Sequence, residues 1–343
     1  MKNMAISLTV GAVLLGAGCF WAGCGSDDTG GTPNATTGGT GGGGGTTTDA
    51  SAGGGGTAGG GAGGTAGGDG AGATGGGGGA DGGKGKNGYV TVSQSVSKTA
   101  GKESGSYKAN AAFSTSATTP GCTTATQGAC EVMTCTTKGG GGSGGAGGAG
   151  VAENAGDITI KGGTVDGGAD NLDLKANAMT GLYAELTGKT PLFADGTAMK
   201  FSAAGTTNIP VFSGTVDAPK TITLTAPTPA ADAGPGAGID VSIGSPPTFK
   251  WTNGDSNVVI TLIDKTTGGT THTAICTFTG SSGTGKIPAA ALTDFAKGAG
   301  SYSVVSQATK SATAGDWTVL LEVNNTGNDA NHALTSGVAT FAK

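Results

Sequence analysis

The sequence contains no arginine: all 18 of its basic residues are lysine, and 23 acidic residues outnumber them to give a formal net charge of -5. Without guanidinium groups for bidentate phosphate contacts, and without a basic surplus, a nucleic-acid-binding protein is disfavoured. Aromatic residues make up only 5% of the chain and charged residues 12%, against about 25% charged residues in an average protein. A carbohydrate-binding surface, which usually needs exposed aromatic rings, therefore has few candidates.

The sequence has only two histidines, His272 and His332, which narrows the options for general-base and metal chemistry. Neither lies near a Gly-x-Ser-x-Gly segment, and no pair of carboxylates or activated nucleophile is evident. We therefore predict that the protein is not an enzyme and uses no cofactor. A catalytic triad assembled in space from distant residues stays open as an alternative.

Glycine, in contrast, is abundant, with 74 residues among 343, and it is concentrated in the first 88 positions. Residues 24–88 are mostly Gly, Thr, Ala and Ser with scattered Asp. This segment has almost nothing large and apolar to bury, so it cannot offset the entropy lost on ordering. We expect a disordered tether with a root-mean-square span on the order of 43 Å.

The amino terminus has the plan of an export signal, with Lys2, the apolar run Met4–Leu15 and no further charge until Asp27. Small residues then surround Cys19 and Cys24. The segment Trp21-Ala-Gly-Cys24 resembles the lipobox of bacterial lipoproteins, in which two small residues precede a cysteine that receives a diacylglyceryl group. Trp21 departs from this pattern, because an aliphatic residue, usually leucine, is expected at its position.

The resemblance implies that residues 1–23 are a signal peptide and that acylated Cys24 holds the protein in a membrane. Because Gly25 rather than Asp follows, it also implies the outer membrane, at the cell surface or the periplasmic face. Several acyl chains on one sulfur give a stable anchor, whereas a single chain is marginal. An ordinary signal cleaved beside Ala17 or Ala22, and an uncleaved apolar span, stay open.

Residues 89–343 predict an all-β fold, because short runs with period-two alternation are separated by clusters of Gly, Pro, Asn, Asp and Thr. We predict an antiparallel β-sandwich head of two units, 89–227 with a glycine-rich surface loop at 139–150, and 239–343, joined by a connector at 228–238. The expected strands are Tyr89–Gln94, Tyr107–Phe113, Cys130–Thr136, Asp157–Lys161, Leu182–Leu186, Met199–Ala203, Val211–Gly214, Thr221–Thr225, Ile239–Ile243, Thr248–Thr252, Val258–Ile263, His272–Phe278, Ser301–Gln307, Trp317–Val323 and Val338–Phe341.

The last of these units resembles an immunoglobulin-like or fibronectin-type sandwich, in its seven expected strands and in Trp251 followed by the apolar strand Val258–Ile263. One helix is expected within it, over Ile287–Lys297. Pro288 suits the first turn of a helix, Lys297 suits its negative end, and Gly298 can close it.

Four cysteines remain if Cys19 is removed and Cys24 is acylated, and an even number in an exported chain predicts disulfides. Cys130 and Cys135 point to opposite faces of one strand, so they cannot pair. Cys122 can form a local bridge with either of them. Cys276 is then a buried thiol or part of a long-range bridge, and a zinc site is the alternative use of three of the four cysteines, which are Cys122, Cys130, Cys135 and Cys276.

Two further segments have the spacing of binding motifs. The segment Gly280–Lys286 matches the phosphate-loop spacing, but Ile287 stands where a Ser or Thr is needed to hold Mg²⁺, so we predict no nucleotide. Asp166, Asp170 and Asp173 form an acidic loop that could hold calcium, although a solvated turn fits its spacing better.

These observations predict a lipid-anchored envelope protein with a structural, adhesive or interaction role. Its expected partners are the membrane, through acylated Cys24, and envelope proteins or surface polysaccharide. The alternative is an extracellular carbohydrate- or peptide-binding module. Trp251 and Trp317 alternate with core positions, so we expect both to be buried rather than available to a sugar.

Overall fold

The structure, a computed structural model, describes residues 86–99, 102–115, 121–136, 152–164, 171–177, 179–228, 238–264, 269–329 and 335–343. The predicted signal peptide, Cys24, nearly all of the tether, the loop 139–150, most of the connector and His332 lie outside these residues.

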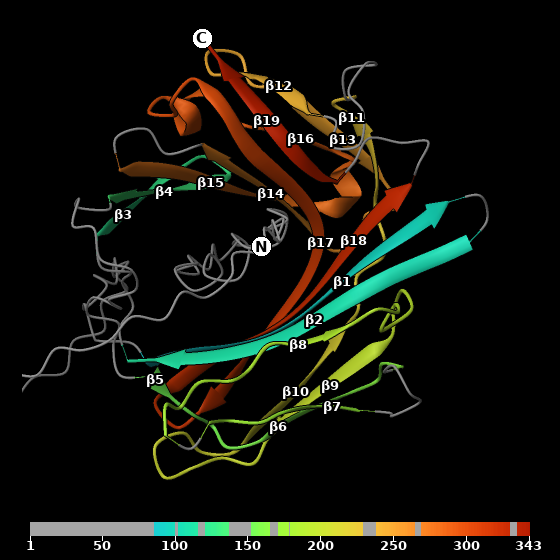
Figure 1. Ribbon diagram of the computed structural model, residues 1–343, viewed down its shortest axis with the longest axis vertical. Coiled ribbons are helices and arrows are strands. Elements are labelled where there is room, and N and C mark those ends of the chain that lie inside the picture. The colour runs from blue at the N-terminus through green and yellow to red at the C-terminus, as the bar shows by residue number, and fades with distance from the viewer. Residues whose placement is uncertain are drawn as a thin grey trace, which may run out of the picture. The chain divides into compact units, whose positions relative to one another are not determined.

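The predicted all-β fold is confirmed, since the described chain is built almost entirely from strands, with two short 3₁₀ helices (Figure 1). The strands before the connector are β1 Lys86–Thr99, β2 Lys102–Ser114, β3 Cys122–Gln127, β4 Cys130–Thr136, β5 Ala152–Glu153, β6 Ile158–Lys161, β7 Asn171–Leu174, β8 Leu186–Gly188, β9 Ala198–Ala203, β10 Phe212–Asp217 and β11 Thr223–Ala226. Those after it are β12 Ile239–Ser242, β13 Thr248–Thr252, β14 Asn257–Asp264, β15 Thr270–Thr279, β16 Thr284–Lys286, β17 Gly298–Ala314, β18 Trp317–Asp329 and β19 Ser336–Ala342, with η1 at Gly280–Ser282 and η2 at Ala289–Leu292.

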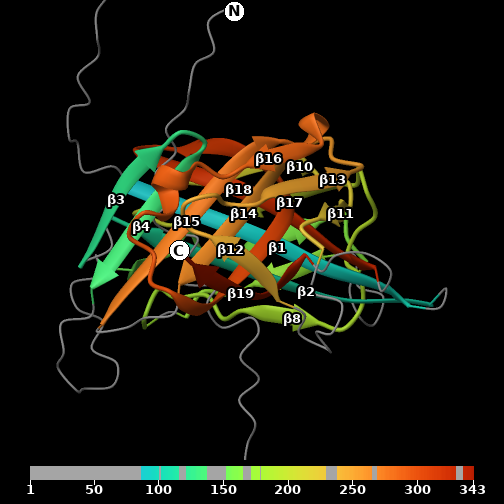
Figure 2. The ribbon, with the colours of Figure 1, turned by 90° about the horizontal axis from the view of Figure 1, so that it is seen from above.

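One large sheet organises the fold, with the strand order β3-β4-β15-β14-β17-β18-β1-β2-β5 and with β8, β19 and β12 attached to it. A four-stranded sheet, β10-β9-β6-β7, and a three-stranded sheet, β11-β13-β16, complete the described strands. Figure 1 shows β6, β7, β9 and β10 beside the long strands β1 and β2, and β11, β13 and β16 near β12 and β19. Figure 2 shows the hairpin of β3 and β4 at one edge of the large sheet.

Each small sheet packs on the large sheet around a hydrophobic core of its own. The first core joins apolar residues of β6, β9 and β10, such as Ile160, Phe201 and Val216, to Val92 and Leu321 of the large sheet. The second core joins Leu224, Phe249 and Trp251 of the three-stranded sheet to Ile260 and Val304. Alternation along each strand sends one set of side chains into a core, so the described head consists of two sandwiches that share a sheet.

Strand β17 takes part in both sandwiches. Its first part, from Gly298 to Gln307, pairs with β19 and β14, and its side chains Tyr302 and Val304 enter the second core. Its later part pairs with β18, and Ala308 and Ala312 pack against the first core. A single long strand therefore ties the two cores together, which the shorter expected strand Ser301–Gln307 did not anticipate.

The predicted domains at 89–227 and 239–343 do not correspond to two separate groups of strands. Strand β4 pairs with β15, and β1 pairs with β18, so both predicted segments contribute to one sheet. Cys130, from the first segment, belongs to the second core, while Trp317, from the second segment, belongs to the first. Two of the pairings, β1 with β18 and β12 with β19, are parallel rather than antiparallel. In both pairs the two strands are far apart in the sequence, as parallel strands require because a long stretch of chain must connect them.

The predicted helix over Ile287–Lys297 is wrong, because only the 3₁₀ turn Ala289–Leu292 forms there. Ala291 and Leu292 are buried in the second core, together with Phe295 just beyond the turn. The backbone N–H of Ala296 donates to Asp264 Oδ2 at 2.9 Å, rather than to a carbonyl one helical turn earlier. A tertiary hydrogen bond and core packing thus override the local helix signals.

The predicted strand Leu182–Leu186 is largely irregular: Tyr183 forms an isolated bridge with Ala176, and regular pairing begins only at Leu186. Strands β3, β5, β7 and β16 were not predicted. Strand β3 was missed because its residues Cys122–Gln127 have no apolar alternation, and most of them are exposed.

Candidate functional site

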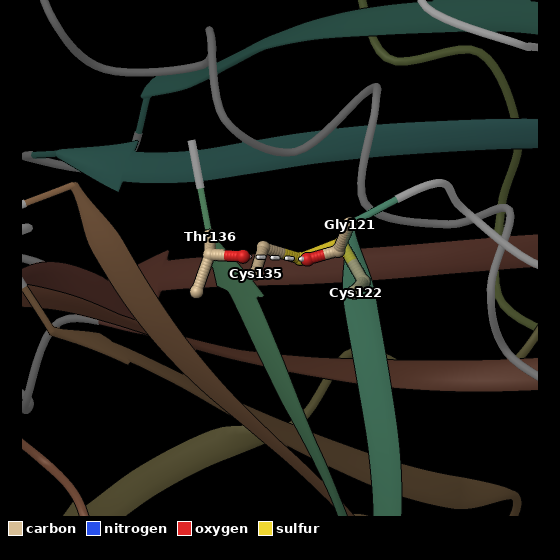
Figure 3. The surroundings of a disulfide bond; sticks show 4 residues. All are labelled: Gly121, Cys122, Cys135 and Thr136. Atoms are coloured by element: carbon tan, nitrogen blue, oxygen red, sulfur yellow. Dashed lines mark hydrogen bonds between the residues drawn. A yellow bond between two sulfur atoms is a disulfide. The ribbon is translucent and has the colours of Figure 1, made fainter. Parts of the chain in front are cut away.

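The four candidate cysteines form two disulfides, one within the β3–β4 hairpin and one between the hairpin and the neighbouring strand β15. Cys122 bonds to Cys135, which faces it directly in the β3–β4 register, and Cys130 bonds to Cys276, which faces it in the β15–β4 register. The Cys122–Cys135 bond lies at the open end of the hairpin, where Thr136 N donates to Gly121 O at 2.9 Å (Figure 3).

The prediction of disulfides among these cysteines is confirmed. The structure selects Cys135 as the local partner of Cys122, and it makes Cys276 part of a long-range bridge. The two bonds differ in burial: Cys130 and Cys276 are 1% and 0% exposed, whereas Cys122 and Cys135 are partly exposed. All four sulfurs are bonded in pairs, so the zinc alternative has no free thiolates here.

The hairpin closes through a two-residue turn, Gly128–Ala129, between the facing residues Gln127 and Cys130. Gly128 has a φ of +62°, a conformation that short hairpin turns often require and that glycine adopts readily. Beyond β3, none of the described strands continues the sheet, so β3 is an edge strand. No sequence pattern predicts this edge, which follows only from the pairing of β4 with β15.

A buried carboxylate lies on the opposite side of the sheet from the first core. Glu322 is 1% exposed, and its Oε1 accepts a 2.5 Å hydrogen bond from Asn324 Nδ2, which also donates to Ser93 Oγ at 3.3 Å. Burial raises the pKa of Glu322, and hydrogen bonds from Asn324 and Gln307 oppose that rise. Burial, followed by the charge of Glu322, also raises the pKa of Tyr89.

Two buried amide oxygens, Asn324 Oδ1 and Asn110 Oδ1, have no hydrogen-bond partner among the described residues. Together with Glu322 they provide acceptors from β18 and β2, and Glu322 is the only carboxylate of the three. No group of three or more His, Cys, Asp or Glu side chains in the described chain is arranged to hold a metal ion. We expect the buried Glu322 to influence stability and its dependence on pH.

His272 pairs with a buried aspartate. Asp264 is 3% exposed; its Oδ1 accepts from His272 N at 2.7 Å, and its Oδ2 lies 2.7 Å from His272 Nδ1. Together with the bond from Ala296 N, these contacts join the ends of β14 and β15 to the segment after η2. Each oxygen of the carboxylate thus has a structural partner, and the pair fixes three chain segments.

The glycines of the segment Gly280–Lys286 have structural roles. A Cβ on Gly280 would lie 2.2 Å from Ser256 O, Gly283 has a φ of +65°, and a Cβ on Gly285 would meet the ring of Phe278. Strand β16 pairs antiparallel with β13, and only the short turn η2 follows. The parallel strand and long helix that accompany a phosphate loop are therefore missing from this part of the described chain.

The acidic loop is only partly described, because Asp166 and Asp170 lie outside the described residues. Asp173 lies in β7, where its Oδ1 accepts from Thr159 Oγ1 at 2.8 Å. Hydrogen bonds from Thr159 and Asn171 lower the pKa of Asp173. This carboxylate is held against the neighbouring strand β6.

The aromatic side chains of the described residues are buried or half-buried. Trp251 and Trp317 are 3% and 2% exposed, and their indole N–H groups donate to Gly280 O at 2.7 Å and to Asn208 O at 3.0 Å. Every Trp, Tyr and Phe in the described ranges is buried or half-buried. Two surface depressions, of about 350 and 400 Å³, lie beside Asp264 and beside Trp317. Neither is lined by an exposed aromatic platform.

Comparison with known proteins gives no family. No protein-family model matches the chain, and no curated protein matches it. Among solved structures, a yeast delta-COP-I mu-homology domain complexed with a Dsl1 WxWxV peptide matches 70% of this chain and 96% of its own, at 7% identity and a TM-score of 0.18. A likeness this weak supports no conclusion about function. Among the described residues no helix is long and apolar enough to span a bilayer.

Proposed function

We propose that this protein is a lipid-anchored protein of the bacterial envelope, and that its β head acts through its surface as a structural, adhesive or interaction module. In this proposal residues 1–23 direct export, acylated Cys24 anchors the chain in the outer membrane, and residues 24–88 tether the head.

The observation that carries the proposal is the pair of disulfides, Cys122–Cys135 and Cys130–Cys276. Disulfides of this kind persist in oxidising compartments and are rare in the cytosol, so they support export independently of the amino-terminal sequence. The lipobox-like segment ending at Cys24 then supplies the means of retention.

The character of the head supports an interaction role. The depressions beside Asp264 and Trp317 are shallow, no metal-binding cluster lies among the described residues, and Asp264 and His272 are occupied in joining chain segments. Exposed aromatic rings, on which sugars usually stack, are lacking among the described residues. A protein partner therefore fits this surface better than a polysaccharide.

The test is metabolic labelling with radioactive palmitate in a bacterial host that processes lipoproteins. We expect the parent protein and the matched control Cys19→Ala to incorporate label and to fractionate with the outer membrane. Cys24→Ala should incorporate none and leave the membrane fraction. An unlabelled parent protein, or a Cys24→Ala variant that stays in the membrane, would refute the anchor.

A further inference from the structure

The edge strand β3 presents a set of backbone hydrogen-bonding groups that no described strand pairs with. Thr136 N donates to Gly121 O, so Gly121 and Thr136 form a hydrogen-bonded pair, and the next pair, Cys122 with Cys135, is a non-hydrogen-bonded one. Its Cα–Cα separation of 4.1 Å agrees with this assignment. Because the two kinds of pair alternate, the N–H and C=O groups of Cys122, Thr124 and Thr126 point away from β4.

The other terminal strands of the described sheets are short, irregular or charged, as exposed edge strands often are. Strands β5 and β8 are only two and three residues long, and β11 has a register shift between Leu224 and Ala226. The remaining edge strands carry a charged residue each: Asp173 in β7, Asp217 in β10, Asp240 in β12 and Lys286 in β16.

Strand β3 has none of these protections. Its sequence, Cys-Thr-Thr-Ala-Thr-Gln, contains no charge and no proline, and its pairing with β4 runs without a register shift. Threonine favours extended, paired backbone. The disulfides at Cys122 and Cys130 hold the hairpin in place, so little conformational entropy would be lost when another strand adds to this edge.

From this edge we infer that the protein self-associates by antiparallel pairing of β3 with β3 of a second copy. A two-fold axis through Thr124 would place Thr124 opposite Thr124 of the second copy, and Cys122 opposite Thr126. Each of these pairs can exchange backbone hydrogen bonds, because all three residues present outward groups. The absence of charge makes a second copy a suitable partner, since symmetric pairing brings no like charges together.

Pairing along six residues is expected to bury less than the ~1,200 Å² of a stable complex, so the dimer should be weak in solution. Confinement on a membrane would raise the effective concentration of the heads and favour pairing. Only this membrane-bound setting rests on the proposed function. The inference deepens that function by naming a second copy of the chain as the partner.

The test uses the full chain with Cys24→Ala, so that failure of anchoring does not affect it, and measures mass against concentration by sedimentation equilibrium. We expect the apparent mass to rise toward twice the monomer mass. Thr124→Pro removes one outward N–H without touching the β3–β4 ladder, and it should abolish the rise, whereas Thr124→Val should keep it. Retained disulfides and an unchanged melting temperature would show that each variant is folded.

A charge pair gives a second, independent reading. Thr124→Lys would place two lysines opposite each other at the two-fold axis and should prevent association. Because salt screens their repulsion, the effect should be strongest at low salt. Thr123→Lys would face Ala125 of the second copy instead and should leave association intact. The inference is overturned if the parent stays monomeric at every concentration, or if folded Thr124→Pro and Thr124→Lys variants associate like the parent.

Discussion

Gln94 of β1 lies directly opposite Asn325 of β18, and its Nε2 donates to Asn325 Oδ1 at 3.3 Å. Both side chains are buried, at 3% and 0% exposure. Gln94 Oε1 accepts from the backbone N–H groups of Leu192 and Phe193, while Asn325 Nδ2 donates to Pro219 O and Thr221 Oγ1. Two buried amides therefore connect the large sheet to loops on either side of β9 and β10.

The variant Gln94→Ala should destabilise the head strongly. It leaves two buried N–H groups without an acceptor, and each buried unsatisfied group costs about 1–3 kcal/mol. We expect a loss of at least about 2 kcal/mol in the free energy of unfolding, measured by urea titration. Gln127→Ala, at the partly exposed end of β3, is the matched control and should change it by less than about 0.5 kcal/mol. Equal effects of the two variants would contradict the role given to Gln94.

The two disulfides should differ both in accessibility and in their contribution to stability. Under native conditions a phosphine reductant should open Cys122–Cys135 first, because Cys130 and Cys276 are buried. Alkylation followed by peptide mass mapping would give the order. Reduction of Cys130–Cys276 first would contradict the burial described here.

Paired replacement of each disulfide by alanine tests the second difference. Loop-closure entropy for sequence separations of 13 and 146 residues predicts stabilisation by about 3 kcal/mol for Cys122–Cys135 and about 5 kcal/mol for Cys130–Cys276. Cavity formation in the second core would add to the larger value. Thermal unfolding of the two double variants should therefore show the lower melting temperature for the Cys130→Ala, Cys276→Ala protein.

Glu322 should make stability depend on pH. Burial raises its pKa in the folded state, so folding favours the protonated form. That contribution is fully present below the ordinary pKa of 4.5 and is lost as the pH rises through the raised folded-state value. Glu322→Gln imitates the neutral form and should be more stable than the parent at pH 7, with the difference vanishing toward pH 4.

Urea unfolding at several pH values measures this effect. Glu185→Gln is the control, because that side chain is 38% exposed and pairs with Lys108 at the surface, where ion pairs contribute about 0–1 kcal/mol. An unchanged or lowered stability of Glu322→Gln at pH 7 would show that the carboxylate is not buried as described.

The segment Gly280–Lys286 should respond as a packed turn. Gly280→Ala would force a Cβ to within 2.2 Å of Ser256 O and should cost about 1–3 kcal/mol in unfolding free energy. Gly244→Ala has open space around the new Cβ and should leave stability unchanged or raise it by up to about 1 kcal/mol. Addition of ATP with Mg²⁺ should not raise the melting temperature of the parent; a rise would indicate a bound nucleotide.

The sequence predicts those strands in which apolar and polar residues alternate. It does not predict segments whose conformation depends on tertiary contacts. The run Thr248–Thr252 matches β13, because its alternating apolar residues Phe249 and Trp251 enter a core. The run Cys130–Thr136 matches β4, although burial does not alternate along it. The helix expected after Pro288 is lost to the contact between Ala296 and Asp264. Strand β3 could not be predicted, because an exposed strand rich in threonine has no periodicity of apolar residues.

The arrangement of the strands was also beyond sequence reasoning. Pairing of β4 with β15 joins residues that are 146 positions apart at Cys130 and Cys276, and nothing in the local pattern of either strand encodes it. Because Cys130 and Cys135 point to opposite faces of one strand, the sequence excludes a disulfide between them. That removes one connectivity and leaves the others open. Nothing in the sequence indicates the burial of Glu322, because it alternates with the core residues Leu321 and Val323 and so lies on the opposite face of the strand.

The most direct test of the proposed function is the intact mass of the mature protein extracted from bacterial membranes, followed by fragmentation of its amino-terminal peptide. The account predicts a chain that begins at Cys24 and carries a diacylglyceryl group on that sulfur, with Cys122, Cys130, Cys135 and Cys276 all oxidised. A mature chain with an unmodified Cys24, or one with free thiols at these four positions, would contradict it.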